Sequence, residues 1–125
     1  VKVTTMACIL VVDDTASLRN MVTFTLKQEG FDIVEAGNGQ EALTKAQGGR
    51  FDLVLSDVNM PVMDGITFCT ELRKLPAFKF TPVLMLTTES SADMKQKGKT
   101  AGATGWLVKP FNPEKLLSTI KRVIR

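Results

Sequence analysis

Five short apolar segments alternate along the chain with longer amphipathic segments, and this alternation limits the possible folds more than any other feature of the sequence. Each short segment is β-branched or aliphatic and is bounded by Gly, Pro, Asp or Asn, which is typical of buried strands. The expected strands are Ala7 to Val12, Phe31 to Glu35, Leu53 to Ser56, Val83 to Leu86 and Gly105 to Val108. Repeated strand and helix units of this kind predict a doubly wound α/β fold with a five-stranded parallel sheet.

The segments between the expected strands carry apolar residues at helical spacing, so each presents one face to the sheet. Two such faces contain Leu18, Val22, Thr25 and Leu26, and Leu116, Leu117, Ile120, Val123 and Ile124. Helix starts are indicated by Asn38 with Glu41, Ser90 with Asp93, and Asn112 before Pro113. Glycines that can end a helix stand at Gly30, Gly48 and Gly102.

The composition is that of an ordinary globular protein. With 125 residues, of which 44% are hydrophobic, we expect one domain spanning 1–125 with no effector domain. The longest apolar run, Ala7 to Val12, is too short to cross a bilayer and lacks the features of a signal peptide, so we expect a cytoplasmic protein. The chain has no histidine, and Cys8 and Cys69 lie far apart, which argues against a zinc site or a redox motif.

Polar residues follow most of the expected strands. Asp13 and Asp14 come after the first strand, Asp57 after the third, Thr87 after the fourth and Lys109 after the fifth. Ligands of a doubly wound sheet bind beyond the carboxyl ends of its strands, so these side chains should meet in one crevice. Converging carboxylates repel one another unless a pKa rises or a cation binds among them. Oxygen ligands favour a hard cation, and Mg²⁺ is expected because it takes one or two carboxylates and keeps its other positions for water or substrate.

Such a crevice has the parts that phosphoryl transfer needs. The cation and the Lys109 ammonium neutralise charge on the phosphoryl oxygens, and the Thr87 hydroxyl can donate a hydrogen bond to one of them. Without histidine, the expected nucleophile is a carboxylate, which forms an acyl phosphate. Asp57 is the candidate because it stands alone on the middle strand, between the Asp13-Asp14 pair and the lysine.

Four segments resemble the signature segments of bacterial response-regulator receiver domains, in the same order and at the expected separations. They are VVDD at 11–14, SDVNMPVMDG at 56–65, LT at 86–87 and KPF at 109–111. The match covers essentially the whole chain, and within the family it is most similar to stand-alone chemotaxis regulators. The resemblance implies a flavodoxin-like sheet of strand order 2-1-3-4-5, phosphorylation of Asp57, a phosphoryl group held by Thr87 and Lys109, and a cis Lys109-Pro110 peptide.

The same resemblance implies further roles for site residues. Magnesium is expected on Asp14, Asp57 and the main-chain carbonyl of Asn59, with Asp13 joining through water. Asn59 and Glu89 are expected to flank the path of the hydrolytic water. Because both residues match the chemotaxis pattern, the resemblance indicates a short-lived phosphoryl state that an auxiliary phosphatase can shorten further.

Trp106 departs from the commoner family pattern, since receivers usually carry at this position a Tyr or Phe that moves inward with Thr87. Trp is bulkier and its only polar group is a donor, so an inward movement needs a larger opening in the core. Lys95 and Lys99 lie in the same segment as Gly98, which lowers helix propensity. Receivers commonly signal through the fourth helix, fifth strand and fifth helix. We therefore assign Trp106, Lys95 and Lys99 to a switch and partner surface.

The resemblance implies a monomeric signalling switch rather than an enzyme. No nucleic-acid partner is expected because the basic residues are scattered, and no membrane partner is expected because the longest apolar run is too short. The partners that the resemblance implies are a histidine kinase (CheA-like), a flagellar motor switch protein (FliM-like) in chemotaxis, and an auxiliary phosphatase. Two alternatives remain, namely a receiver that relays or drains phosphate in another two-component pathway, and a magnesium-dependent aspartyl-phosphate hydrolase. The hydrolase is disfavoured because such enzymes usually carry a second acid two residues beyond the nucleophile, where this chain has Asn59.

Two other segments have simpler interpretations. The segment 37–42 fits the G-x-G-x-x-A fingerprint of dinucleotide sites, follows an expected strand and has Asp57 about 20 residues on. We reject this fingerprint because the second strand is expected at the edge of the sheet, away from the crevice. Asp64-Gly65 is interpreted as a turn with a helix cap.

Overall fold

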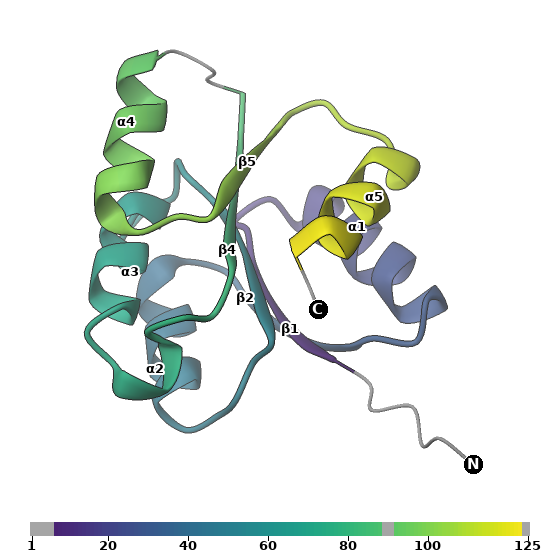
Figure 1. Ribbon diagram of the computed structural model, residues 1–125. Helices are drawn as coiled ribbons and strands as arrows, with labels where there is room; N and C mark the ends of the chain where they lie inside the picture. The colour runs from purple at the N-terminus through teal and green to yellow at the C-terminus, as the bar shows by residue number, and fades with distance from the viewer. Residues whose placement is uncertain (1–6, 89–91, 124–125) are drawn as a thin grey trace.

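The computed structural model describes residues 7–88 and 92–123 (Figure 1). The strands are β1 (Cys8–Val12), β2 (Asp32–Ala36), β3 (Leu53–Asp57), β4 (Val83–Thr87) and β5 (Gly105–Val108). The helices are α1 (Ala16–Gln28), α2 (Gly39–Gln47), α3 (Gly65–Leu72), α4 (Ala92–Ala101) and α5 (Pro113–Val123), with a short 3-10 turn, η1 (Pro76–Phe78). Within the described residues no helix is both long and apolar enough to span a membrane.

The five strands form one parallel sheet in the order β2-β1-β3-β4-β5. This confirms the predicted fold class and strand order. The central strand is β3, and β2 lies at one edge, as the rejection of the dinucleotide fingerprint requires. The order reverses between β1 and β3, so the carboxyl ends of these strands border the crevice where ligands of such sheets bind.

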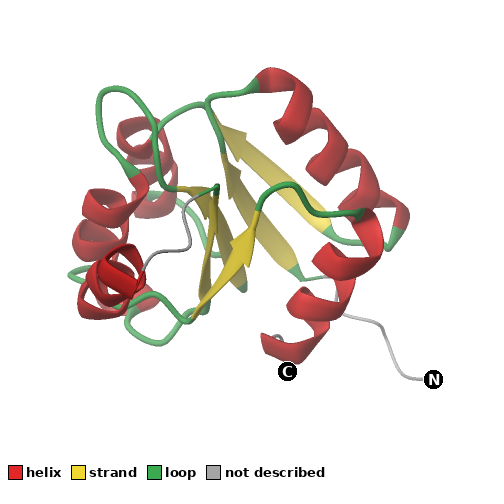
Figure 2. Ribbon diagram, turned by 90° about the horizontal axis from the view of Figure 1, so that it is seen from above, coloured by secondary structure: helices red, strands yellow, loops and turns green. Residues whose placement is uncertain are grey.

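The helices cover both faces of the sheet, with α1 and α5 on one side and α2, α3 and α4 on the other (Figures 1 and 2). Alternate residues of each strand point to opposite faces and contribute to two separate hydrophobic cores. The core under α1 and α5 includes Ile9, Val11, Val22, Leu26, Leu53, Leu55, Leu116 and Ile120. The core under α2, α3 and α4 includes Leu10, Val12, Val54, Phe68, Leu72, Phe78, Val83 and Met85.

The predicted strand bounds are correct to within one residue at each end. Two of the differences matter for the site, because Asp57 and Thr87 are the last residues of β3 and β4 rather than the first residues after them. Asp57 pairs with Leu86, and Thr87 pairs with Val108. Backbone pairing therefore continues up to the functional side chains and fixes their directions.

Helix ends largely follow the predicted signals. The Asn38 side chain accepts a hydrogen bond from the Glu41 N–H at 2.8 Å, and the Asn112 side chain accepts one from the Lys115 N–H at 2.7 Å. The capping box at Asn38 is only half formed, because the Glu41 carboxylate accepts from the N–H of Gly37 instead of that of Asn38. Ser90 and Ile124 lie outside the described residues, so the cap at Ser90 and the last position of the α5 face stay predictions.

Glycines end the helices as predicted. Gly30 follows α1 with φ +91° and Gly102 follows α4 with φ +100°, a region that favours glycine, while Gly48 is the C-cap of α2. Both cysteines are free thiols. Cys69 is buried, and Cys8 is half-exposed at the start of β1. Burial raises the pKa of the Cys69 thiol, so this thiol stays protonated and unreactive.

Candidate functional site

Asp13, Asp14 and Asp57 come together at the carboxyl ends of β1 and β3. One carboxylate oxygen from each lies within 4.8 Å of the other two. Asp13 and Asp57 are almost fully buried, with exposed fractions of 1% and 6%, whereas Asp14 is exposed. The predicted acidic cluster is therefore present, with two members inside the molecule and one at its surface.

Lys109, which follows β5, supplies the positive charge of this cluster. Its Nζ lies 3.1 Å from Asp57 Oδ1 and 3.5 Å from Asp13 Oδ2. The lysine side chain is only 15% exposed, so both ion pairs are largely shielded from water. Thr87, at the end of β4, is also buried, with 1% exposed. The polar side chains after β1 and β5 thus meet that of Asp57 in one cluster, and Thr87 ends the strand that lies between β3 and β5.

The chain around Asp57 is held tightly by its own backbone. The Val58 N–H donates to Asp57 Oδ1 at 2.9 Å, and the Ser56 hydroxyl donates to the Asp57 carbonyl at 2.9 Å. The N–H of Gly65 donates to the Val58 carbonyl at 2.8 Å, which brings the start of α3 against the end of β3. A Cβ at Gly65 would lie 2.1 Å from the Asp57 carbonyl oxygen, closer than any side chain allows.

This contact corrects the simple interpretation of Asp64-Gly65. Asp64 caps α3 as predicted, since its Oδ1 accepts from the Thr67 N–H at 2.7 Å. Gly65 does more than complete a turn, because only a residue without a side chain permits the close approach to Asp57. The signal for this role in the sequence is only a glycine, which any turn can explain.

The electrostatics of the cluster favour a bound cation. Burial raises the pKa of the Asp57 carboxyl, the Lys109 ammonium opposes this rise, and the Asp13 carboxylate adds to it. Asp13 Oδ2 is buried, and no group in the described part of the chain donates a hydrogen bond to it. Two buried carboxylates share one ammonium here, so the oxygen donors match a hard divalent cation such as Mg²⁺.

The structure also describes Asn59, Lys95 and Lys99 among the remaining predicted site residues. Asn59 is exposed and lines a groove of about 200 Å³ together with Met94 and Lys97 of α4. Lys95 and Lys99 are exposed on α4. Glu89 lies outside the described residues, so its place beside the hydrolytic water stays a prediction. The Lys109-Pro110 peptide is cis, as the resemblance implies.

Trp106 is half-buried on β5 and packs against α4 at Gly98. A Cβ on Gly98 would lie 2.3 Å from Trp106 Cζ2, so the indole occupies the space that any other residue at this position would fill. Gly98 is itself buried. Lower helix propensity is therefore not the main effect of Gly98, which instead makes room for a large aromatic ring.

The fingerprint segment after β2 satisfies its own backbone. The Gly37 N–H, which would face a phosphate in a dinucleotide site, donates to Glu41 Oε1 at 2.7 Å. The Gly39 N–H donates to the Met63 carbonyl at 3.1 Å. Two backbone donors at the start of α2 are thus occupied by the protein itself, in agreement with the rejection of a nucleotide site.

The chain is similar to a known protein family and to curated proteins over most of its length. A family model described as the response regulator receiver domain matches residues 9–121. The transcriptional regulatory protein ResD of Bacillus subtilis (strain 168) is 38% identical over 117 residues, which is 94% of this chain and 48% of that protein. The chain thus spans about half the length of the curated relatives it matches.

Two solved structures extend the comparison. The chemotaxis protein CheY4 of Vibrio cholerae is 57% identical with a TM-score of 0.94, over 96% of this chain and 100% of that chain. The receiver domain of the sensor histidine kinase PA1611 of Pseudomonas aeruginosa PAO1 is 25% identical with a TM-score of 0.88, over 95% of this chain and 98% of that chain. The latter structure is described as having a magnesium ion coordinated in its active-site cleft.

Proposed function

This chain belongs to the response regulator receiver domain family, and from that premise we propose that a histidine kinase phosphorylates Asp57 in a magnesium-dependent reaction. The protein is a CheY-like receiver of two-component signalling rather than an enzyme of the ordinary kind. The observation that carries the proposal is the contact of 3.1 Å between Lys109 Nζ and Asp57 Oδ1 inside a cluster of three carboxylates.

The cation would be held by Asp14, Asp57 and the main-chain carbonyl of Asn59, with Asp13 joining through water. When bound, Mg²⁺ neutralises charge on the transferred phosphoryl group. PA1611, which has a similar fold, holds magnesium in its cleft, and the buried Asp13 Oδ2 without a hydrogen-bond donor in the described chain supports the same chemistry here.

The protein's own residues align and neutralise the reacting groups. A carboxylate oxygen of Asp57 attacks the phosphorus of a phosphohistidine, the phosphorus–nitrogen bond breaks, and the histidine leaves with the nitrogen electron pair. Lys109 exchanges one partner for another in this step, because its ammonium passes from the free carboxylate to the oxygens of the acyl phosphate. Thr87, buried at the end of β4, donates its hydroxyl to a phosphoryl oxygen.

Incubation with acetyl phosphate and Mg²⁺, followed by intact mass measurement, tests this proposal. We expect one added phosphoryl group, which is absent in Asp57→Asn and blocked by a chelator. Asn59 and Glu89 would flank the hydrolytic water, so the label should decay within the experiment and an auxiliary phosphatase should speed its loss. Label on another residue would refute the site, and many turnovers of phosphate release from small phosphoesters would favour the hydrolase.

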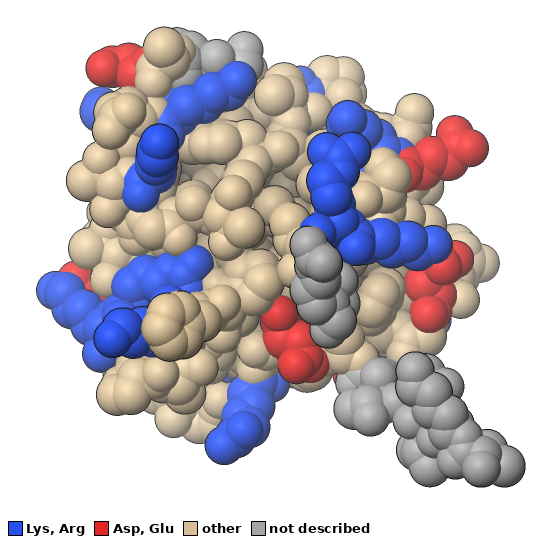
Figure 3. Space-filling model, viewed as in Figure 1, with Lys and Arg blue, Asp and Glu red and all other residues tan. Residues whose placement is uncertain are grey.

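The proposed target surface consists of Trp106, Lys95 and Lys99 on β5 and α4. Figure 3 shows Lys and Arg over α4 on one side and over α5 on the other, with uncharged surface between them. This arrangement suits an acidic partner with apolar side chains. Phosphorylation shifts the population toward a form that such a partner binds more tightly.

The partner we propose is a flagellar motor switch protein (FliM-like), with a CheA-like histidine kinase as donor and the cytoplasm as the site of action. The likeness to CheY4, a chemotaxis protein, supports this choice. Pull-down with a motor-switch peptide, with and without the phosphoryl analogue beryllofluoride, tests it. A gain in binding with the analogue is expected, and equal binding would favour a receiver that relays or drains phosphate in another pathway.

A further inference from the structure

Asp13 is held by three hydrogen bonds, two to its main chain and one to its side chain. Its N–H donates to the Ala36 carbonyl at 3.1 Å, and its Oδ1 accepts from the Thr15 N–H at 2.8 Å. Its carbonyl accepts a hydrogen bond of 2.5 Å from Arg19 Nη1. With these groups engaged, the other carboxylate oxygen, Oδ2, lies in the cluster, where its contact is the ion pair with Lys109 Nζ at 3.5 Å.

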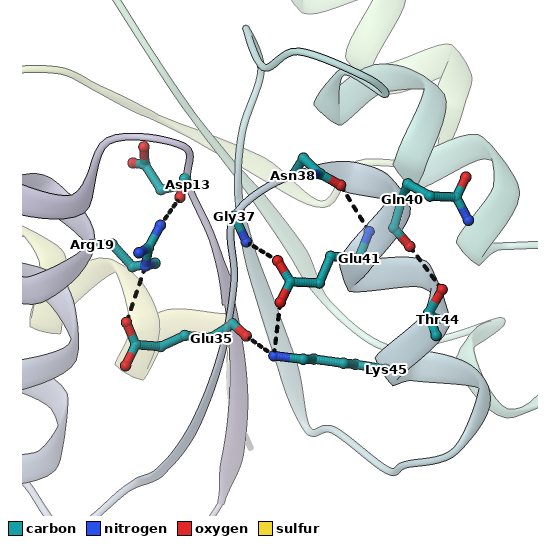
Figure 4. Close-up of polar contacts among 9 residues, drawn as sticks. All are labelled: Asp13, Arg19, Glu35, Gly37, Asn38, Gln40, Glu41, Thr44 and Lys45. Atoms are coloured by element: carbon teal, nitrogen blue, oxygen red, sulfur yellow. Dashed lines mark hydrogen bonds and ion pairs between the residues drawn. The ribbon is translucent and has the colours of Figure 1, made fainter.

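Arg19 is itself anchored at a second point. Its Nε donates to Glu35 Oε1 at 3.1 Å, while its Nη1 reaches Asp13, so the planar guanidinium spans α1, β2 and the end of β1 (Figure 4). The side chains of Arg19 and Glu35 are 23% and 39% exposed, so the pair is partly shielded from water. A rigid fork with two fixed partners holds the carbonyl in one direction better than a flexible ammonium can.

The anchor is supported in turn by α2. Lys45 donates to the Glu35 carbonyl and lies 3.2 Å from the Glu41 carboxylate, which accepts from the Gly37 N–H (Figure 4). The network therefore ties the loop after β2 to the loop after β1. It lies on the side of the cluster opposite to the residues on β4 and β5 that carry the phosphoryl chemistry.

We propose that Arg19 is a positioning residue of the metal site, holding the Asp13 carbonyl so that Asp13 Oδ2 faces the cation. This inference rests on the proposed function, because it concerns the magnesium that the receiver chemistry requires. Arg19 touches neither the phosphoryl group nor the metal. It acts through the backbone of Asp13, in the way that hydrogen-bonding partners of metal ligands orient those ligands.

The direction of the change in Mg²⁺ affinity distinguishes a positioning role of Arg19 from an effect of its charge alone. Arg19 carries a positive charge near the cluster, and by Coulomb's law that charge repels Mg²⁺. If charge alone mattered, Arg19→Met would tighten Mg²⁺ binding and Arg19→Lys would leave it unchanged. If Arg19 positions Asp13, both variants bind Mg²⁺ more weakly, because both lose the fork.

Calorimetric titration of each variant with MgCl₂ measures its Mg²⁺ affinity and so tests the proposal. We expect Arg19→Lys to weaken Mg²⁺ binding about tenfold, the lower end of the range for such partners. In metal-free protein, hydrogen exchange at the Asp13 N–H should be faster in Arg19→Lys than in wild type. Arg50→Met, which removes an exposed arginine just before β3 at the other end of the sheet, is the matched control and should leave both readouts unchanged.

A pair of variants at Glu35 gives an independent test at constant charge. Glu35→Gln keeps an oxygen acceptor for Arg19 Nε and Glu35→Ala does not, although both remove the same charge. Positioning predicts that Glu35→Ala binds Mg²⁺ more weakly than Glu35→Gln. Equal affinities in this pair, or unchanged affinity in Arg19→Lys, would overturn the inference while wild-type Mg²⁺ binding and phosphorylation remain. Absence of Mg²⁺ binding in wild type would overturn the inference and the proposed function together.

Discussion

Lys109 and Trp106 belong to the same stretch of chain but are held in place by different forces. Lys109, just after β5, is fixed by ion pairs with Asp57 and Asp13. Trp106, within β5, is fixed by shape, because its indole fills the space left by the absent side chain of Gly98. One region therefore depends on compensation of buried charge, and the other depends on the fit of one ring to one backbone.

Mutations in the two regions should have different consequences for the protein. Removing one member of a buried ion pair leaves the other charges without compensation, which is costly and changes the chemistry of the site. Adding one methyl group to a close-packed contact forces atoms apart and costs packing energy, without altering any charge.

Replacement of Lys109 by Met should have the largest effect. The variant removes the only ammonium that contacts Asp57 within the described chain, so phosphorylation by acetyl phosphate should slow about 100-fold. Mg²⁺ binding should become tighter at the same time, because a competing positive charge has been removed from the carboxylates. Phosphorylation rates from intact mass and affinity from calorimetry check the two directions.

Lys27→Met is the matched control, since Lys27 is an exposed residue of the last turn of α1. It removes the same charge away from the cluster and should alter neither quantity. If Lys109→Met phosphorylated at the wild-type rate, the lysine would have no part in stabilising the transferred group.

Replacement of Gly98 by Ala should have the next largest effect, in the direction opposite to the usual one. In an exposed helix this change stabilises by about 1 kcal/mol. Here the new Cβ would lie 2.3 Å from Trp106 Cζ2, and overpacking of that kind costs about 1–3 kcal/mol. A net loss of about 1 kcal/mol in the free energy of unfolding is expected from urea denaturation.

Two further variants test whether the indole ring of Trp106 is what the new methyl group contacts. In a Trp106→Phe background the Cζ2 atom is gone, so Gly98→Ala should become stabilising. Gly48→Ala places a Cβ where no described atom lies within 4 Å and should change stability by less than about 0.5 kcal/mol. A loss from Gly98→Ala that persisted in the Phe background would show that the indole is not what the methyl group meets.

The sequence predicts the charged region well because its residues lie at, or just after, the carboxyl ends of buried strands. The topology of a doubly wound sheet then brings Asp13, Asp57, Thr87 and Lys109 together whatever the details of packing. The contact between Gly98 and Trp106 could not be predicted in this way. It depends on the distance between a helix and a strand, and a glycine in a helix gives no sign of which side chain fills its space.

The same limit applies to backbone contacts around the site. The Arg19 hydrogen bond to the Asp13 carbonyl and the approach of Gly65 to Asp57 both depend on how separate elements meet. The change of the Glu41 carboxylate from the Asn38 N–H to the Gly37 N–H is a one-residue difference that spacing alone does not resolve. Residue order predicts which elements meet, while contacts of this length require the packed structure.

Backbone strain can be tested at Val62, in the loop after β3, where a smaller change in stability is expected. It has φ +71°, which is unfavourable for a β-branched residue, and its side chain is 80% exposed. The Met63 N–H donates to the Pro61 carbonyl at 2.7 Å across it. Val62→Gly should therefore stabilise the protein by about 0.5–1 kcal/mol in urea denaturation, since relief of strain exceeds the entropy cost of glycine. A loss of stability would mean that the loop is unstrained.

A change of pH should alter the stability contributed by the charged region but not that contributed by the contact between Gly98 and Trp106, and this is the smallest expected effect. Burial raises the pKa of Asp57 above its ordinary value in the folded, metal-free protein. Between the ordinary and raised values the folded state binds more protons than the unfolded state, so Asp57 lowers stability as pH rises through that window. Asp57→Asn lacks this titration.

In chelator, the stability of Asp57→Asn relative to wild type should therefore increase from acidic to neutral pH. The penalty of Gly98→Ala should stay constant over the same range, because no titrating group takes part in its contact with Trp106. A stability difference for Asp57→Asn that did not change with pH would contradict the electrostatic account of the buried carboxylate.

A crystal structure of the protein grown in magnesium chloride tests the central claim most directly. The account predicts one ion bound between Asp14 and Asp57, with Lys109 Nζ still directed at the Asp57 carboxylate. An acidic cluster without an ion under these conditions, or a Lys109 side chain turned away from Asp57, would contradict it.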